Sequence, residues 1–182
     1  MTQPTRLFFG IALPTSVQRA LIAWRSTAFP AETGRPVAAA NLHLTLAFLG
    51  DVTPGQQARL SAQAGRIRQR PFRLALDDAG HWPASGAVWI GPHRAPRGLH
   101  QLATLLRSQA ARGGCYQSPL PFHPHVTLLR GATRPVALPP RTFHWSFPVS
   151  QFSLFASESS RGGVRYRPIA HWPLTDEDTH AL

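Results

Sequence analysis

The sequence predicts an α+β fold in which mostly antiparallel sheets carry helices on their outer faces. Three longer segments repeat apolar residues at helical spacing. Shorter apolar segments, bounded by glycine and proline, lie between and after them and are typical of strands. In chain order the segments run β-α-β-α-β-β-α-β and end in further strands, and this order is typical of α+β domains.

The first half of the chain is expected to alternate strands and helices. The expected elements are a strand at 6–13, a helix at 15–28, a strand at 41–50 and a helix near 54–69. A loop rich in Pro, Gly and Ala separates the first helix from the second strand. Thr15 with Gln18, and Thr53 with Gln56, match the capping box that begins a helix. The apolar stripes of the two helices are expected in the core: Val17, Leu21, Trp24, Ala28, Leu60, Ala64 and Ile67.

The second half is expected to be richer in strands. Strands are expected at 72–77, 87–91, 122–130 and, shorter, at 142–147, with two late strands at 149–157 and 164–174. Residues 78–86 are expected to form a loop, and residues 175–182 a polar, frayed tail. A helix at 96–112 carries Leu99, Leu102, Leu106 and Ala110 on one side and ends at Gly113-Gly114.

Composition indicates one domain, or two tightly joined lobes, with a polyanionic partner. The chain has 182 residues and a formal charge of +11, from 19 basic and 8 acidic residues. Every basic residue is arginine, whose planar fork of donors matches phosphate oxygens, although biased genome composition explains the absence of lysine equally well. The net charge favours a nucleic acid partner.

The single cysteine, Cys115, excludes an internal disulfide and a cysteine-based metal cluster. A cytoplasmic protein is therefore expected. No apolar run approaches the roughly 18 residues of a membrane helix, so no membrane partner is expected. The apolar segment 7–13 imitates a short signal peptide, but Pro14 and a helix follow it directly, and a buried strand is expected there.

One tetrapeptide pattern occurs twice, as His43-Leu44-Thr45-Leu46 and His125-Val126-Thr127-Leu128. Two copies of His-x-Thr-Leu are improbable by chance, and their offset of 82 residues is close to half the chain, which suggests two similar halves. Both copies are expected on strands, where residues two apart point to the same face about 7 Å apart. Each copy thus presents an imidazole and a hydroxyl side by side.

Two imidazoles facing one basic cleft can carry out acid–base catalysis without a cofactor. An unperturbed histidine has a pKa of about 6.5, so one can be neutral and the other protonated near neutral pH. The Thr45 and Thr127 hydroxyls would donate to non-bridging phosphate oxygens, and Arg130 would add a charged donor. A cyclic phosphodiester suits such a site, because in-line attack needs a base and an acid on opposite sides.

Other kinds of site are less well supported by the residues. His123 and His125 are two apart and could share a metal, but only Asp51 lies near either motif, so a carboxylate-supported metal site is not expected. The Gly-x-Ser-x-Gly motif of serine hydrolases is absent.

The paired motifs and their surroundings resemble the 2H phosphoesterase superfamily, named for its two HXTX motifs. More narrowly, the chain is similar to the bacterial RNA 2′,3′-cyclic phosphodiesterases, also called 2′–5′ RNA ligases. The blocks that carry the resemblance are 6–14, 41–50, 122–130, 152–157, 163–166 and 171–174. The resemblance implies a bilobal fold, with two pseudo-symmetric sheets forming a central groove and helices outside.

The resemblance also implies a reaction: metal-free opening of a terminal 2′,3′-cyclic phosphate of RNA to a 2′-phosphomonoester. His43 matches the family's proton donor to the leaving oxygen, and His125 matches the base that activates water. Thr45 and Thr127 match the phosphate-holding positions. The residues alone are nearly symmetric and leave the order of acid and base open. Reversible 2′–5′ ligation is implied as well, and the expected substrates are tRNA halves or oligonucleotides bound by a monomer.

Two alternatives remain open from the sequence. The fold could act on a small cyclic phosphodiester or a 2′–5′ oligonucleotide. The +11 charge would also suit a non-catalytic RNA-binding module. The residues that stack a terminal base cannot be chosen, and Phe8, Phe9, Phe48 and Trp82 are candidates.

Overall fold

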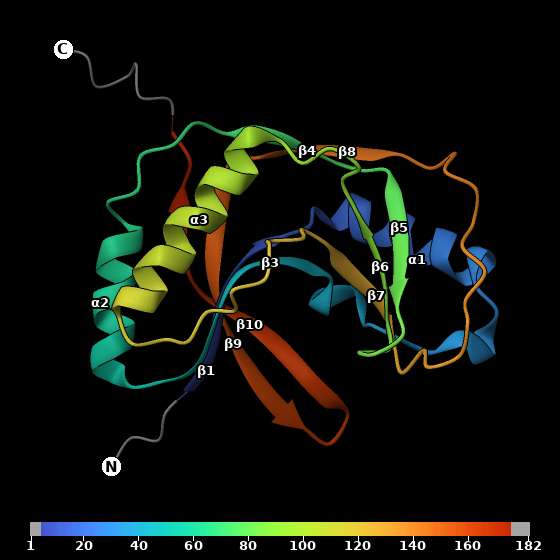
Figure 1. The fold of residues 1–182 in the computed structure, drawn as a ribbon, viewed down its shortest axis with the longest axis horizontal. Coiled ribbons are helices and arrows are strands. Elements are labelled where there is room, and N and C mark those ends of the chain that lie inside the picture. The colour runs from blue at the N-terminus through green and yellow to red at the C-terminus, as the bar shows by residue number, and fades with distance from the viewer. Residues whose placement is uncertain (1–4, 176–182) are drawn as a thin grey trace.

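The computed structural model describes residues 5–175 and has the expected α+β architecture (Figure 1). In chain order the elements are β1 (Thr5–Ala12), α1 (Thr15–Ala28), β2 (Arg35–Pro36), β3 (His43–Val52), α2 (Pro54–Ala64), β4 (Phe72–Leu76), β5 (Asp78–Trp82), β6 (Ala87–Gly91), α3 (Arg97–Arg112), β7 (Val126–Arg130), β8 (Trp145–Val149), β9 (Gln151–Ser160) and β10 (Gly163–Pro173). Short 3-10 turns span Ala31–Thr33 and Ala39–Asn41. The expected polar tail lies, except for Thr175, outside the described residues.

The main sheet consists of two antiparallel halves that meet at a narrow seam. Its strand order is β10-β9-β1-β3-β7-β6-β5, and β2 pairs with β7. The seam between β3 and β7 is one pair of Cα partners, Leu44 and Val126, which are the second residues of the two repeated motifs. The motif strands are therefore neighbours at the centre of the sheet.

The order of strands is similar on either side of the seam. β3 is followed outward by β1 and β9, and β7 by β6 and β5. In sequence, β1 leads through α1 to β3, and β6 leads through α3 to β7. β4 and β8 pair with each other as a separate two-stranded sheet. β4 directly precedes β5 in sequence and β8 directly precedes β9, and these two strands occupy matching places on either side of the seam.

The helices lie outside the sheet. In Figure 1, α2 and α3 lie together at one end of the molecule and α1 at the other. α3 packs on β3 through its apolar stripe, and the four residues expected in the core are fully buried: Leu99, Leu102, Leu106 and Ala110. Burial of such a stripe supplies most of a surface helix's stability. The β9–β10 hairpin projects from the body of the molecule (Figure 1).

The helix starts agree with the prediction in one case and not in the other. At α2, the Thr53 hydroxyl accepts from the Gln56 backbone N–H at 3.2 Å and the Gln56 side chain accepts from the Thr53 N–H at 3.0 Å, so this capping box is confirmed. At α1 the predicted box is wrong, because Pro14 is the N-cap and the Gln18 amide donates instead to the Leu13 carbonyl at 3.1 Å.

Helix α2 is shorter than expected and ends at Ala64, with Gly65 as its C-cap. The arginines at 66, 68 and 70 therefore lie beyond the helix, where Arg68 Nη1 donates to the carbonyl of the C-cap Gly65 at 3.1 Å. In α1, Arg25 is buried although the apolar spacing did not include it. Its Nη1 donates to the Val37 carbonyl at 2.8 Å and the Leu128 carbonyl at 3.1 Å, so it joins α1 to the second motif strand.

Two strand predictions also need correction. Residues 78–82, expected in a loop, form β5, which pairs with β6. Gly80 interrupts the apolar pattern there, but it is required because the Trp89 indole occupies the place that a Cβ would take. The second motif strand begins at Val126 rather than 122, since Pro124 has no N–H to give to a sheet ladder, and His125 stands just before the strand.

Candidate active site

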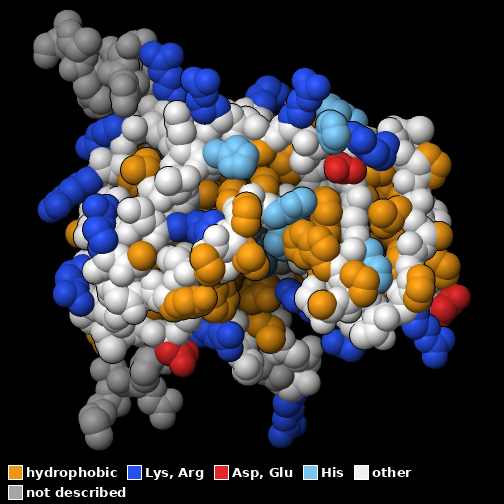
Figure 2. All heavy atoms as spheres, in the orientation of Figure 1, with side chains coloured by type: hydrophobic (Ala, Val, Ile, Leu, Met, Phe, Trp, Pro, Cys, Tyr) orange, Lys and Arg blue, Asp and Glu red, His pale blue; other side chains and the backbone are white. Residues whose placement is uncertain are grey.

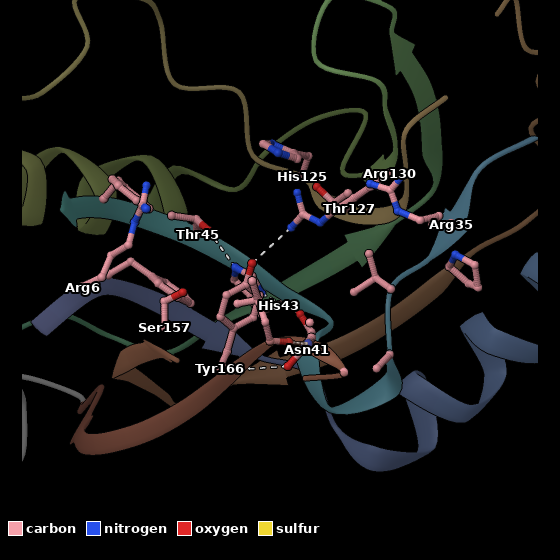
Figure 3. Close-up of a pocket in the computed structure, with 18 residues that line it drawn as sticks. Arg6, Arg35, Asn41, His43, Thr45, His125, Thr127, Arg130, Ser157 and Tyr166 are labelled. Atoms are coloured by element: carbon pink, nitrogen blue, oxygen red, sulfur yellow. Dashed lines mark hydrogen bonds between the residues drawn. The ribbon is translucent and has the colours of Figure 1, made fainter. Parts of the chain in front are cut away.

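The two motifs line one cavity of about 790 Å³ at the seam between β3 and β7. All five residues predicted for the site lie on its wall: His43, Thr45, His125, Thr127 and Arg130 (Figure 3). The described residues of the wall include no Asp or Glu but three arginines, so the cavity is basic. In Figure 2, histidine side chains gather near the centre of one face and arginines surround its edge, while carboxylates are sparse.

Both histidines are anchored in the same way. His43 Nδ1 lies 2.7 Å from the Asn41 carbonyl, and His125 Nδ1 lies 2.8 Å from the His123 carbonyl. A carbonyl only accepts, so each Nδ1 carries the proton and each Nε2 is left for other partners. The sequence places this acceptor two residues before each histidine, at the entry to the motif strand. Both imidazoles are thus held in one orientation and tautomer.

The threonines lie on the same face as the histidines, as period-two alternation predicted. Along 43–48 and along 125–130 the first and third residues are half-buried at the cavity, while the second, fourth and fifth are buried. Thr45 Oγ1 lies 2.9 Å from His43 Nε2 (Figure 3). Because His43 Nδ1 holds the proton, the Thr45 hydroxyl donates to Nε2 when His43 is neutral.

Aromatic rings surround each histidine. The His43 ring packs on Phe8 at a centroid distance of 4.7 Å and on the edge of Tyr166 at 4.9 Å. His125 packs on the edge of Trp82 at 4.7 Å. Such surroundings limit hydration of an imidazolium, so they favour the neutral ring.

The histidine pKa values reflect this environment. Burial lowers the pKa of His43 to about 4, with a smaller opposing effect from the Asn41 hydrogen bond and further lowering by Arg130 and His125. Burial also lowers the pKa of His125, and the charges of His123 and Arg130 act in the same direction. Both rings are therefore neutral at neutral pH in the empty site. A bound phosphate anion would favour their protonation.

Two of the three arginines gather at one side of the cavity. Arg130 and Arg35 are Cα partners in the β7–β2 pair, and Arg6 lies on the opposite side of His43 (Figure 3). The Arg6 guanidinium lies 5.3 Å from the centre of the Phe48 ring. Phe48 is 47% exposed at the cavity edge, so one end of the cavity offers two cations and the other an aromatic face with a cation.

Several residues of the cavity were not predicted as site residues: Arg6, Arg35, Asn41, Ser157 and Tyr166. All of them except Arg35 lie in the blocks that carry the family resemblance, and this resemblance was the signal that could have found them. Arg35 lies in a loop of Pro, Gly and Ala, and its place beside Arg130 depends on a two-residue strand that no local pattern announces.

A metal site at His123 and His125 was the main rival. The two rings lie 6.4 Å apart between centroids, and His123 is directed against Trp89 at 4.7 Å. Within residues 5–175, no three side chains of His, Cys, Asp or Glu are placed to hold one metal ion. The same part of the chain has no helix that is long and apolar enough to cross a membrane.

The chain is similar to one family along most of its length. The model of the family described as LigT-like phosphoesterase matches it twice, at residues 11–89 and 90–166. A curated relative from Escherichia coli, an RNA 2′,3′-cyclic phosphodiesterase, is 57% identical over 175 residues, which cover 96% of this chain and 99% of the relative. A relative of the same name from Thermus thermophilus is 32% identical over 94% of this chain and 91% of its own.

Solved structures agree with these relatives. The structure of E. coli LigT complexed with 3′-AMP has a TM-score of 0.92 at 57% identity, and it covers 95% of this chain and 99% of its own. E. coli LigT complexed with phosphate has a TM-score of 0.88 at 53% identity, with 96% and 100% covered. A structure from Thermus thermophilus has a TM-score of 0.81 at 30% identity, with 94% and 99% covered.

Proposed function

Because the chain belongs to the family of LigT-like phosphoesterases, within the 2H superfamily, we propose that it is an RNA 2′,3′-cyclic phosphodiesterase. It is an enzyme of phosphodiester hydrolysis, and its curated relatives carry this activity in their names. The observation that carries the proposal is the pair of histidines, each fixed at Nδ1 by a carbonyl and each lining one basic cavity. The proposed product is a 2′-phosphomonoester.

The proposed reaction needs one base, one acid and donors to the phosphate. Neutral His125 takes a proton at Nε2 from water as the water oxygen attacks phosphorus. The P–O3′ bond breaks, and His43 gives a proton from Nε2 to the 3′ oxygen. Atoms and charge balance, because one proton passes from water to His125 and one passes from His43 to the 3′ oxygen. The order of the two histidines follows the family resemblance.

The remaining groups of the site stabilise the negative charge that develops on the phosphate oxygens. The Thr45 and Thr127 hydroxyls donate to these oxygens, and Arg130 adds a cationic donor. His43 must be protonated to act as acid, although burial holds its pKa at about 4 in the empty site. The substrate anion supplies the compensation, because a negative charge beside an imidazole raises its pKa. Substrate binding thus charges the acid at the moment it is needed.

Phe48 is the proposed platform for the terminal base. Of the four aromatic candidates, Phe9 is 1% exposed and Phe8 is 2% exposed beneath His43, so neither offers a face to a nucleobase. Trp82 already packs against His125. Phe48 lines the cavity and is half exposed, and base stacking on such a ring contributes about 1–3 kcal/mol.

The wider predictions remain proposals. We propose one domain of two pseudo-symmetric lobes for residues 1–182, which the double family match and the similar strand order about the seam support. A monomer in the cytoplasm that acts on tRNA halves or oligonucleotides is proposed too. The buried free thiol of Cys115 suits a reducing compartment. Reversible 2′–5′ ligation would be the same chemistry run backwards.

The test is hydrolysis of a short RNA that ends in a 2′,3′-cyclic phosphate, assayed with and without EDTA. We expect turnover to a 2′-phosphate in both conditions. His43→Ala and His125→Ala should each lower kcat by about a thousandfold or more, since each removes one proton transfer from a concerted step. Full activity of either variant, or mainly 3′-phosphate as product, would contradict the proposal.

Turnover of a cyclic mononucleotide alone would instead favour a small-molecule phosphodiesterase. Salt-dependent RNA affinity without turnover would favour a binding module.

A further inference from the structure

The β9–β10 hairpin forms one wall of the cavity, and the Asn41 side chain bonds to the edge of its second strand. Asn41 donates from Nδ2 to the Val164 carbonyl at 2.7 Å, and its Oδ1 accepts from the Tyr166 backbone N–H at 3.1 Å. These are the two groups that a neighbouring strand would engage on β10. The Asn41 amide thus takes the place of a strand at the edge of β10 (Figure 3).

Asn41 also acts on the first histidine. Its backbone carbonyl accepts from His43 Nδ1 at 2.7 Å, so one residue fixes both the imidazole and the hairpin. Asn41 lies in the 3-10 turn Ala39–Asn41, before β3 begins at His43. Its side chain is therefore free to bond to Val164 and Tyr166 of β10. The link joins positions 41 and 164–166, which are more than a hundred residues apart.

Tyr166 extends the link to the second half of the sheet. Its ring edge packs on His43 at 4.9 Å and on Phe8 at 5.2 Å. Its hydroxyl accepts from Arg130 Nη2 at 3.2 Å (Figure 3). Tyr166 belongs to β10 in one half of the sheet, and Arg130 ends β7 in the other. The contact therefore crosses the seam, at which the ladder itself has one pair of partners.

Arg130 can be held in one orientation by a hydrogen-bond partner such as the Tyr166 hydroxyl. Its side chain is exposed and long, so fixing it in one conformation costs rotamer entropy. The described wall of the cavity offers it no carboxylate, and Arg35, its Cα partner on β2, carries the same charge. The tyrosine hydroxyl is neutral, so it directs the guanidinium without neutralising the charge that a phosphate requires.

We propose that Asn41 and Tyr166 form a positioning clamp for the catalytic residues. Asn41 fixes the hairpin, and through it Tyr166, while the Tyr166 hydroxyl aims Arg130 at the reacting phosphate. The role of the clamp in catalysis rests on the proposed function, whereas its geometry does not. The clamp makes the two halves of the site depend on one another.

The chain offers a matched control, because it contains two tyrosines. Tyr116 is 83% exposed and is absent from the cavity wall. Tyr166→Phe keeps the ring on His43 and removes the hydroxyl alone. We expect kcat on the cyclic-phosphate RNA to fall about tenfold with little change in KM, which matches about 1.4 kcal/mol for a hydrogen bond to a charged group. Tyr116→Phe should behave as wild type, and both variants should unfold at the wild-type temperature.

A double-mutant cycle shows whether the hydroxyl acts through Arg130. In an Arg130→Ala background, Tyr166→Phe should lower kcat less than twofold, because the aimed group is gone. Wild-type kcat for Tyr166→Phe, or an equal loss in both backgrounds, would overturn the clamp.

Asn41→Ala tests the other end of the clamp. Loss of both amide bonds should speed hydrogen exchange at the Tyr166 amide by tenfold or more, while amides of the α3 core keep their rates. Unchanged exchange at Tyr166 would overturn this part. If the wild type fails to hydrolyse RNA, the proposed function fails, yet hydrogen exchange at the Tyr166 amide in Asn41→Ala still decides whether Asn41 holds the hairpin.

Discussion

The two motif segments, 43–48 and 125–130, share one burial pattern and have similar residue types at the first five positions, but they differ in chemistry at the sixth. In both, the burial runs half-buried, buried, half-buried, buried, buried, exposed. The histidine and threonine occupy the two half-buried positions, and each histidine is anchored to a carbonyl two residues earlier. The exposed sixth residue is Phe48 in the first copy and Arg130 in the second.

In the proposed reaction this difference would give a nearly symmetric site two distinct ends. The shared positions supply what both sides of a phosphorus centre need, which is an imidazole and a hydroxyl. The sixth residues would face the two ends of the substrate, which differ, since a nucleotide has a flat base at one end and an anion at the other. An aromatic ring suits the first and a guanidinium the second. The comparison can be tested position by position.

Truncation of the sixth residue should have the largest effect of these tests and should differ between the copies. Arg130→Ala removes a donor to developing charge, so kcat should fall about a hundredfold. Phe48→Ala removes a stacking face of about 1–3 kcal/mol and should lower kcat/KM about tenfold, chiefly through KM. Steady-state kinetics on the cyclic-phosphate RNA measures both. Equal losses in the same parameter would mean that the copies are not specialised in this way.

Replacement of the threonines should separate the copies further. Thr45→Val and Thr127→Val keep the shape and remove one donor to the phosphate, so each should lower kcat about tenfold. Only Thr45 also lies 2.9 Å from a histidine Nε2. Its hydroxyl supports neutral His43, so Thr45→Val alone should raise the pKa of His43. NMR titration of the two histidines in each variant checks this, and a shift in Thr127→Val instead would reverse the assignment.

The pH dependence should show a smaller effect, of about one pH unit. In the free enzyme burial holds the pKa of His43 at about 4, so little of the acid is protonated at neutral pH and kcat/KM should fall as pH rises. A bound phosphate raises this pKa, so the alkaline limb of kcat should lie at least about one pH unit above that of kcat/KM. Coincident limbs would show that the substrate does not charge His43.

Folding stability should depend on the same groups with a definite sign. Both histidine pKa values are lowered in the folded state, so between about pH 4 and pH 6.5 the unfolded chain binds more protons. The free energy of unfolding is therefore highest above this window and falls as the pH is lowered through it. In His43→Gln the slope should be shallower by up to about 1.4 kcal/mol per pH unit, as denaturant unfolding at several pH values would show.

Local patterns in the sequence predicted much of the fold and of the proposed site. The stripe of α3, the Thr53 capping box and the two motif strands are each encoded within a few residues, by periodicity or by one side chain near its own backbone. The predictions that failed share a cause, which is that each depends on contacts with distant parts of the chain. β5 was missed because Gly80 makes room for Trp89, and the buried place of Arg25 in α1 depends on carbonyls at 37 and 128.

The α+β class, the duplicated histidine and threonine pairs and the basic character of the chain can be recognised from the residues alone. These properties follow from residue types and short spacings. Packing in three dimensions places β3 beside β7 and Arg35 beside Arg130, and it lets Asn41 and Tyr166 connect the two motifs. It also decided the low pKa of His43, because burial depends on which distant rings surround it. Contacts across more than a hundred residues depend on strand register and packing, and no local spacing specifies them.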